Sequence, residues 1–314
     1  MANVFFQATK DALDNITAAF SFVHPLRASM QYTRQRVATL SMGNPDADDM
    51  FFRAEIDPSG SIHGVAYEDA FIKTRWEEQE EQLAWLLLNN LFAIFEGWAQ
   101  RIFEERFGPK GCYNEKVFIK KFQFPGLSTS FSTYYARGSN KSDVMENAFF
   151  GIYQTSSKLD FAKLDNYLLL YRYFKEARNC YMHRNFAASQ EIIDAYNNFL
   201  PVASVTALDA EEVPVIIPPR LGQPVQLSIR GVIGFSQFVR RILIISDINL
   251  IKTTAAEDEF LSKKPDGWLL RTLSGDRTHA KGQITQYTKK AGFLKPVWSE
   301  EYQQFLIING IFGR

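Results

Sequence analysis

Apolar residues recur every three or four positions along much of this chain, which is the spacing of one face of an α-helix. The pattern is longest in residues 75–107, which begin with several glutamates and so suit the positive N-terminal end of a helix dipole. Gly108 and Pro109 then interrupt the pattern, as is typical of a helix C-terminus. The spacing therefore predicts one long helix over residues 75–107.

The segments on either side are less regular. Residues 1–42 predict two helices that meet near Pro25, because proline disfavours helical backbone in the residue before it. Residues 43–65 are rich in turn-forming residues and predict a surface excursion. Residues 109–157 predict an irregular insert, which contains a strand at 117–124 followed by a polar loop.

Helical spacing returns in the second half of the chain. Residues 201–226 contain five prolines and predict an extended crossover, with a short strand at 213–217. Four further helical segments are expected, at 159–200, 231–251, 280–291 and 299–308. The sequence therefore predicts an all-α fold: a helical bundle at 75–260 with irregular insertions, an N-terminal helical segment at 1–74 and a small C-terminal appendage at 261–314.

The overall composition is that of a folded protein, with 46% hydrophobic and 22% charged residues. The 35 basic and 35 acidic side chains cancel, so any nucleic acid has to be bound by a local patch rather than by the net charge. No run of about 20 uninterrupted apolar residues is present, and no signal-peptide pattern opens the chain, so no membrane span is expected. These features predict a soluble, cytoplasmic protein.

The cysteines and histidines do not form a metal-binding pattern. Cys112 and Cys180 are far apart, which excludes a zinc ribbon and provides no disulfide framework. His24, His63 and His279 each lack a second ligand at metal-binding spacing. We therefore expect neither a metal nor another cofactor, and interpret Cys180 as a packing residue.

One short segment combines the residue types that metal-independent RNA cleavage requires. Such cleavage needs a base for the 2′-hydroxyl and a positive charge beside the phosphorus atom. His183 offers a base with a pKa in the working range, and Arg178 offers a permanent charge with several donors for phosphate oxygens. We therefore interpret these two residues as catalytic candidates.

The spacing within this segment limits which side chains act together. On an ideal helix, five residues turn about 500°, which leaves Arg178 and His183 about 140° apart around the axis. Asn179 and His183 are four residues apart and share a face, so Asn179 is expected to orient the imidazole or to bind a phosphate oxygen. Tyr181 is an alternative phosphate contact.

Charged neighbours complete the candidate site. Arg172, Lys175 and Arg184 make the surroundings basic and are the candidate RNA-binding residues. Glu96 lies within the apolar face of the 75–107 helix and has two interpretations. It is either a residue at the edge of that face in contact with solvent, or a carboxylate that positions Arg178, because buried carboxylates are normally paired.

The sequence Arg178-Asn179-x-x-x-His183 resembles the R-N-x-x-x-H motif of HEPN domains. The likeness extends over residues 75–255, where strong helices precede and follow the motif, and it is specific only at the six residues themselves. It implies a HEPN-type endoribonuclease that leaves 2′,3′-cyclic phosphate ends. It also implies a homodimer in which two motifs form a composite site, and a toxin–antitoxin or phage-defence role with an antitoxin or defence-system partner.

Two other functions stay open. The first is a helical module without catalytic activity that binds a nucleotide, RNA or a protein partner, with His183 as a hydrogen-bonded residue at a helix end. The second is DNA binding by the basic C-terminal segment 278–290.

Overall fold

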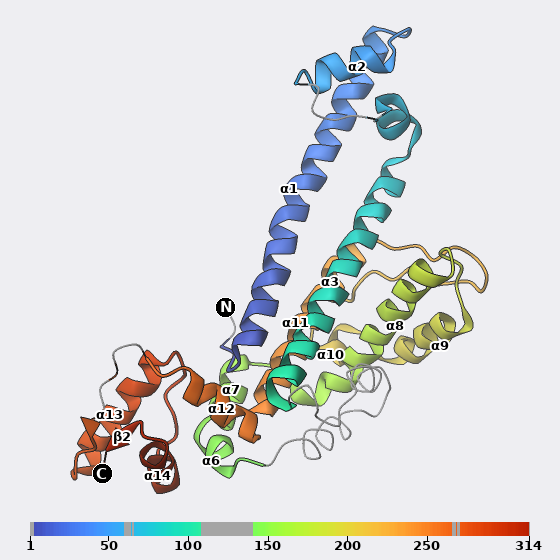
Figure 1. Cartoon of the computed structure of the whole chain (residues 1–314). Helices are drawn as coiled ribbons and strands as arrows, with labels where there is room; N and C mark the ends of the chain where they lie inside the picture. Colours follow the sequence, from blue (N-terminus) through green and yellow to red (C-terminus); the bar gives the residue numbers. More distant parts are fainter. Residues whose placement is uncertain are drawn as a thin grey trace.

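The computed structural model describes residues 3–59, 64, 66–107, 141–265, 268 and 271–313. Most of these residues are helical and the strands are very short, which confirms the expected all-α fold. Figure 1 shows a helical body, an arm of two long helices that projects from it, and a smaller C-terminal appendage beside it. None of the helices in the described part of the chain is both long enough and apolar enough to cross a membrane.

The arm consists of α1 (Gln7–Gly43) and α3 (Trp76–Phe107), which run side by side in opposite directions (Figure 1). The helix expected at 75–107 is thus confirmed as α3. Residues 1–42 do not form two helices, because α1 continues through Pro25. Pro25 has no backbone N–H, so it costs the helix one backbone hydrogen bond. The residue is exposed, and contacts between α1 and α3 hold the chain helical.

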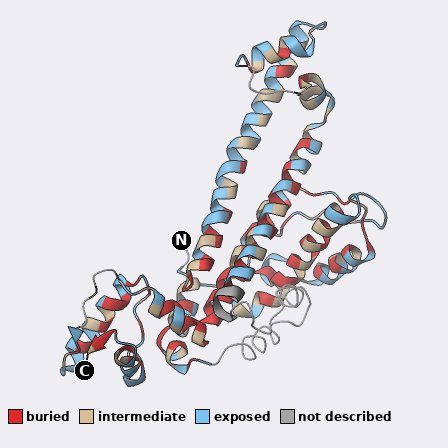
Figure 2. Ribbon diagram, viewed as in Figure 1, coloured by how far each residue is buried: buried red, intermediate tan, exposed pale blue. Residues whose placement is uncertain are grey.

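The tip of the arm has a small apolar cluster of its own, made by Val37, Phe52 and Tyr67. Phe52 belongs to α2 (Asp49–Ile56), and the π-helical turn η1 (Asp69–Lys73) follows Tyr67. The excursion expected at 43–65 therefore contains a helix that packs back on α1. Figure 2 shows buried residues at the tip and in the body, with mostly exposed positions along the outer side of α1.

The body is built around α3, α8 (Leu164–His183) and α11 (Ile229–Leu250), which pack on one another. Aromatic rings fill the space between them: Phe92 lies 5.2 Å from Tyr171, and Phe174 stacks on Phe235 at 4.3 Å between ring centroids. The smaller helices around this core are η3 (Phe161–Lys163), α9 (Gln190–Phe199), η4 (Leu200–Val202), α10 (Val205–Leu208) and α12 (Thr254–Ser262).

The helix expected over 159–200 is interrupted after His183. Asn185 and Phe186 adopt left-handed backbone conformations, which end α8, and α9 starts at Gln190. The extended crossover stabilises this break, since the N–H of Ala188 donates to the carbonyl of Gln223 at 2.8 Å. The periodicity persists across the break because both helices bury one side in the same core.

The crossover 201–226 is extended in part, but residues 213–217 do not form the expected strand. They lie against the start of α11, where Gly231 and Gly234 allow a close approach. A Cβ atom on Gly231 would collide with the carbonyl oxygen of Val215, and one on Gly234 would lie 3.2 Å from Pro214. Packing thus accounts for these two glycines.

The described part of the expected irregular insert is helical. Residues 143–157 form α6 (Asp143–Met145), the π-helical η2 (Glu146–Phe150) and α7 (Gly151–Ser157). Met145, Phe149 and Tyr153 are buried in the main core, which explains why this stretch folds as part of the body. The strand expected at 117–124 lies outside the described residues.

The appendage contains β1 (Arg271–Thr272), α13 (Arg277–Lys290), α14 (Glu300–Ile308) and β2 (Phe312–Gly313). The two short strands pair in parallel, and both helices expected in the last fifty residues are confirmed. Phe149 of the body contacts Phe293 and Tyr302 of the appendage, at 6.1 and 5.5 Å between ring centroids. The apolar core therefore continues from the body into the appendage.

A buried carboxylate fastens the first turn of α1 to the body. Asp247, in the last turn of α11, accepts hydrogen bonds from the N–H groups of Phe5 at 2.6 Å and Phe6 at 3.0 Å. Thr9 also hydrogen bonds to Asp247, and its hydroxyl accepts the indole N–H of Trp98 at 3.0 Å. The network thus connects α1, α3 and α11, and provides acceptors for the two backbone N–H groups just before α1. The first N–H group of the helix, that of Gln7, donates to Glu259 Oε1 at 2.9 Å.

We expect Asp247→Ala to lower the free energy of unfolding by about 3 kcal/mol, because two buried N–H groups lose their acceptor. Urea denaturation measures the change. Asp258→Ala is the matched control, since Asp258 is exposed on the neighbouring α12. A similar loss of stability in both variants would contradict the role of Asp247.

The same residue predicts a pH dependence. Burial raises the pKa of Asp247 from 3.8 to about 7, although the hydrogen bonds from Phe5, Thr9 and Phe6 oppose this shift. The folded protein therefore retains the proton to higher pH than the unfolded chain does. This group stabilises the fold most at low pH, and its contribution is lost as the pH rises from the unfolded pKa towards 7. Asp247→Ala is expected to lack this component of the pH–stability profile.

Candidate functional site

The motif occupies the C-terminal end of α8, and one of its faces carries a row of polar side chains. Arg172, Glu176, Asn179 and His183 follow one another at helical spacing. Arg172 Nη2 lies 3.0 Å from Glu176 Oε1, and Asn179 Nδ2 donates to Glu176 Oε2 at 3.1 Å. The structure therefore brings Asn179 to Glu176, and no hydrogen bond joins Asn179 to His183 among the described residues.

His183 is the last residue of α8, and its side chain is exposed. Within the described residues, its imidazole has no hydrogen-bond partner. The alternative of a hydrogen-bonded histidine at a helix end thus finds no partner among the described residues and stays a prediction. The imidazole is accessible to a ligand or to a second molecule.

Arg178 points towards α3 instead. Its Nη1 atom lies 2.8 Å from Glu96 Oε1, and its Cζ atom lies 5.5 Å from the centroid of the Phe92 ring. The expected pairing of Glu96 with Arg178 is thus confirmed. Glu96 is also 30% exposed, so it lies at the edge of the apolar face as well. Both interpretations of its position hold.

Two polar atoms near this ion pair are buried without a hydrogen-bond partner among the described residues: Arg178 Nε and the hydroxyl of Tyr171. Burial raises the pKa of Tyr171 well above its usual value of 10, and the nearby Glu96 carboxylate adds to the shift. The tyrosine therefore stays neutral at physiological pH. The Nε donor of Arg178 is shielded from solvent, while its Nη1 atom is engaged by Glu96.

Arg178 and His183 are not brought together within one chain. Arg178 contacts α3, whereas His183 projects from the exposed end of α8 on the face that carries Asn179. This agrees with the separation expected from the helical spacing. A site that uses both residues on one phosphate group therefore needs a second copy of the chain or a rearrangement of Arg178.

Tyr181 contributes to packing. Its ring stacks on Trp85 at 4.9 Å between centroids and meets Phe186 edge-on at the same distance. These contacts hold the end of α8 against α3. Cys180 is buried, as expected, with its Sγ atom 3.8 Å from Ser189 Oγ.

The three candidate RNA-binding residues do not form a free basic patch. Arg172 pairs with Glu176, and Arg184 Nη2 lies 3.7 Å from Glu191 Oε2. Burial lowers the pKa of Lys175 to about 8, although the charge of Glu176 opposes the shift. Each positive charge is therefore offset by a carboxylate or weakened by burial.

Glu176 is the residue that the sequence analysis missed. It is 7% exposed and connects Arg172 to Asn179. Its spacing of four residues after Arg172 and three before Asn179 is a signal that was available in the sequence. In the described part of the chain, no cluster of three or more histidine, cysteine or acidic residues is arranged to hold a metal ion.

Comparisons of the chain with protein-family models, curated proteins and solved structures find no match.

The Arg178–Glu96 pair is expected to have a measurable coupling energy, because both side chains are mostly buried, at 23% and 30% exposed. A double-mutant cycle with Arg178→Ala and Glu96→Ala is expected to give about 1.5 kcal/mol. The matched control is Arg230–Glu212, an ion pair of similar length whose side chains are 69% and 57% exposed. Its coupling is expected to be below about 0.5 kcal/mol. Equal coupling energies would contradict a structural role for the Glu96 contact.

Proposed function

We propose that this protein is a metal-independent endoribonuclease of the HEPN type. The observation that supports this most is the end of α8, where the exposed His183 has no hydrogen-bond partner among the described residues and lies one turn from Asn179. Glu96 meanwhile holds Arg178 on another face of the helix. The segment that resembles the R-N-x-x-x-H motif thus presents its base to solvent and keeps its arginine ordered. A cytoplasmic homodimer with an antitoxin or defence-system partner completes the proposal.

In the proposed reaction, the imidazole of His183 takes the proton of a ribose 2′-hydroxyl. The 2′-oxygen then attacks the adjacent phosphorus atom, and the bond from phosphorus to the 5′-oxygen breaks. The guanidinium of Arg178 stabilises the extra negative charge on the phosphate oxygens. A proton returns to the leaving 5′-oxygen, so the products are a 2′,3′-cyclic phosphate and a 5′-hydroxyl.

Because Arg178 and His183 lie apart in one chain, the proposal includes a composite site rather than a rearrangement of Arg178. In the proposed dimer, Arg178 of one subunit and His183 of the other act on the same phosphate group. The Arg178 side chain is 23% exposed, and the exposed part of its guanidinium supplies donors for that phosphate. Glu96 keeps the guanidinium oriented, and Glu176 keeps Asn179 ordered beside the imidazole.

The first test measures cleavage of total RNA by the purified protein in the presence of EDTA. His183→Ala is expected to reduce the rate by about 100-fold or more, through loss of the base. Arg178→Lys keeps the charge but removes the planar fork, so it is also expected to reduce the rate strongly. His279→Ala, on the exposed surface of α13, and Arg230→Ala are the matched controls and are expected to retain the wild-type rate.

Two outcomes would reject parts of the proposal. If the wild-type protein leaves RNA intact at high concentration, it is not a ribonuclease of this simple kind. If it cleaves RNA and the Arg178 and His183 variants cleave equally well, the site lies elsewhere.

The second test addresses the composite site. Subunits carrying Arg178→Ala and His183→Ala are co-expressed with different affinity tags, and the heterodimer is isolated. One of its two composite sites is intact, so it is expected to have about half the activity of the wild-type dimer. Either mutant homodimer is expected to be inactive. An inactive heterodimer, or a wild-type protein that is monomeric by light scattering, would contradict the composite site.

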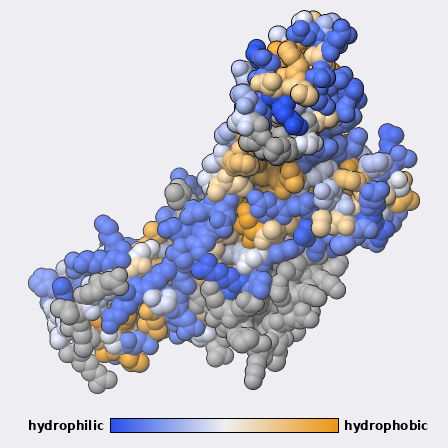
Figure 3. All heavy atoms as spheres, turned by 45° about the horizontal axis from the view of Figure 1, so that its top comes forward, coloured by the Kyte–Doolittle hydropathy of each residue, from blue (hydrophilic) through white to orange (hydrophobic). Residues whose placement is uncertain are grey.

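A helical module without catalytic activity is the second candidate function. It is favoured by the direction of Arg178, which faces α3 rather than His183. The arm also exposes large apolar side chains, among them Phe22, Met42, Met50 and Leu86. Figure 3 shows apolar atoms at the tip of the arm and just below it, within a mainly hydrophilic surface. Under this alternative the arm binds a protein partner, and the RNA assay gives no cleavage.

A further inference from the structure

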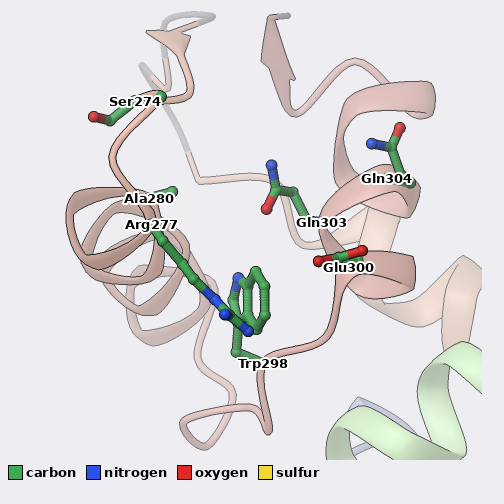
Figure 4. Close-up of a pocket in the computed structure, with 8 residues that line it drawn as sticks. Ser274, Arg277, Ala280, Trp298, Glu300, Gln303 and Gln304 are labelled. Atoms are coloured by element: carbon green, nitrogen blue, oxygen red, sulfur yellow. The ribbon is translucent and has the colours of Figure 1, made fainter.

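The appendage contains a pocket of about 360 Å³ that the α8 motif does not use. It opens between α13 and α14, and Figure 4 shows the side chains that line it. Its wall is formed by Ser274, Gly275, Arg277, Ala280, Trp298, Glu300, Gln303 and Gln304. The size is within the range of pockets that bind small organic molecules.

An aromatic ring with two cations forms one side of the pocket. Arg277 Cζ lies 4.3 Å and Lys281 Nζ lies 4.8 Å from the centroid of the Trp298 ring. The indole N–H of Trp298 is buried and has no hydrogen-bond partner among the described residues. Buried donors normally have an acceptor, and a ligand is able to supply the one that this N–H group lacks among the described residues. Arg277 is exposed, and its guanidinium lies over the face of the Trp298 ring.

The opposite side is polar. Glu300 and Gln303 extend from α14 towards Arg277 and the Trp298 ring (Figure 4). No hydrogen bond or ion pair with a described residue engages the side chains of Glu300, Gln303 or Gln304. Two amides and a carboxylate offer both donors and acceptors. A site for a simple anion would not include a carboxylate, because the two negative charges repel each other.

The charge around the pocket is also distinctive. Residues 261–314 contain nine basic and four acidic side chains, whereas residues 1–260 contain 26 basic and 31 acidic ones. The net charge of the whole chain is zero, but the net charge of the appendage is positive and that of residues 1–260 is negative. A positively charged surface of this kind attracts phosphate groups.

We propose that this pocket binds one ribonucleotide unit, as a free nucleotide or as part of an RNA strand. The base packs at the Trp298 ring, and its edge hydrogen bonds to Glu300, Gln303 and Gln304. Arg277 moves from the indole ring to the phosphate group. An aromatic wall, a hydrogen-bonding edge and a cation are the combination that a planar, phosphorylated base requires. The proposal is independent of RNA cleavage, because the motif on α8 contributes no residue to this pocket.

The test uses the full chain with EDTA and two kinds of probe. Calorimetry measures binding of the four ribonucleoside monophosphates and of inorganic phosphate. Fluorescence anisotropy measures binding of a labelled single-stranded RNA with 2′-O-methyl groups, which cannot be cleaved by 2′-oxygen attack. Arg277→Ala and Gln303→Ala are each expected to weaken binding by roughly tenfold, through loss of a hydrogen bond to a charged or buried group.

Lys289→Ala is the matched control, since Lys289 is an exposed cation of α13 outside the pocket wall. It is expected to leave the affinity for monophosphates unchanged. Glu300→Gln is a second variant at an exposed position, and it is expected to change the preference among the four bases. Thermal unfolding confirms that each variant is folded.

The outcomes distinguish the two sources of the nucleotide. If the wild-type protein binds the monophosphates and Arg277→Ala weakens this binding, the ligand is a free nucleotide. If the wild-type protein binds only the RNA and Arg277→Ala weakens this binding, the ligand is part of a strand. The proposal would be overturned if neither probe bound, or if inorganic phosphate bound as tightly as the nucleotides. Equal affinities of the wild type, Arg277→Ala and Gln303→Ala would also overturn it. His183→Ala is expected to bind as the wild type does, so failure of the cleavage proposal leaves this result unaffected.

Discussion

The buried carboxylate of Asp247 is the contact on which the arrangement of the long helices depends. It receives two backbone N–H groups from the residues before α1 and the hydroxyl of Thr9, which in turn accepts the indole N–H of Trp98. Three helices thus meet at one carboxyl group inside the core. A buried polar group is costly unless it is hydrogen bonded, so the first turn of α1 is constrained to this position. The direction of the arm follows from that constraint.

The geometry of the motif depends on the same arrangement. Since α1 fixes α3, it also fixes Glu96, which reaches the guanidinium of Arg178 across the interface between α3 and α8. Trp85, in the first half of the same helix, stacks on Tyr181 and holds the last turn of α8. The arginine is therefore ordered by tertiary contacts, while His183 extends beyond them into solvent.

Charge is distributed differently in the body and in the appendage. Around the motif, Glu176 and Glu191 offset Arg172 and Arg184, so the local excess of positive charge suggested by the sequence is small. In the appendage, by contrast, Arg277 has no ion pair with any described residue and lies over Trp298. The two regions thus differ in the electrostatic field that they present to a phosphate group.

Local spacing in the sequence was sufficient for the all-α class, for α3 and α11, and for the angular separation of Arg178 from His183, because these follow from helical periodicity alone. The continuity of α1 through Pro25 and the end of α8 at His183 were decided by packing and by hydrogen bonds from distant segments. The hydrogen bonds of Asp247 join residues about 240 positions apart, which no local pattern reveals. The sequence by itself thus determined the helices and the residue types of the candidate site. Only the tertiary structure decided which side chains meet, since contacts between distant segments depend on how the helices pack.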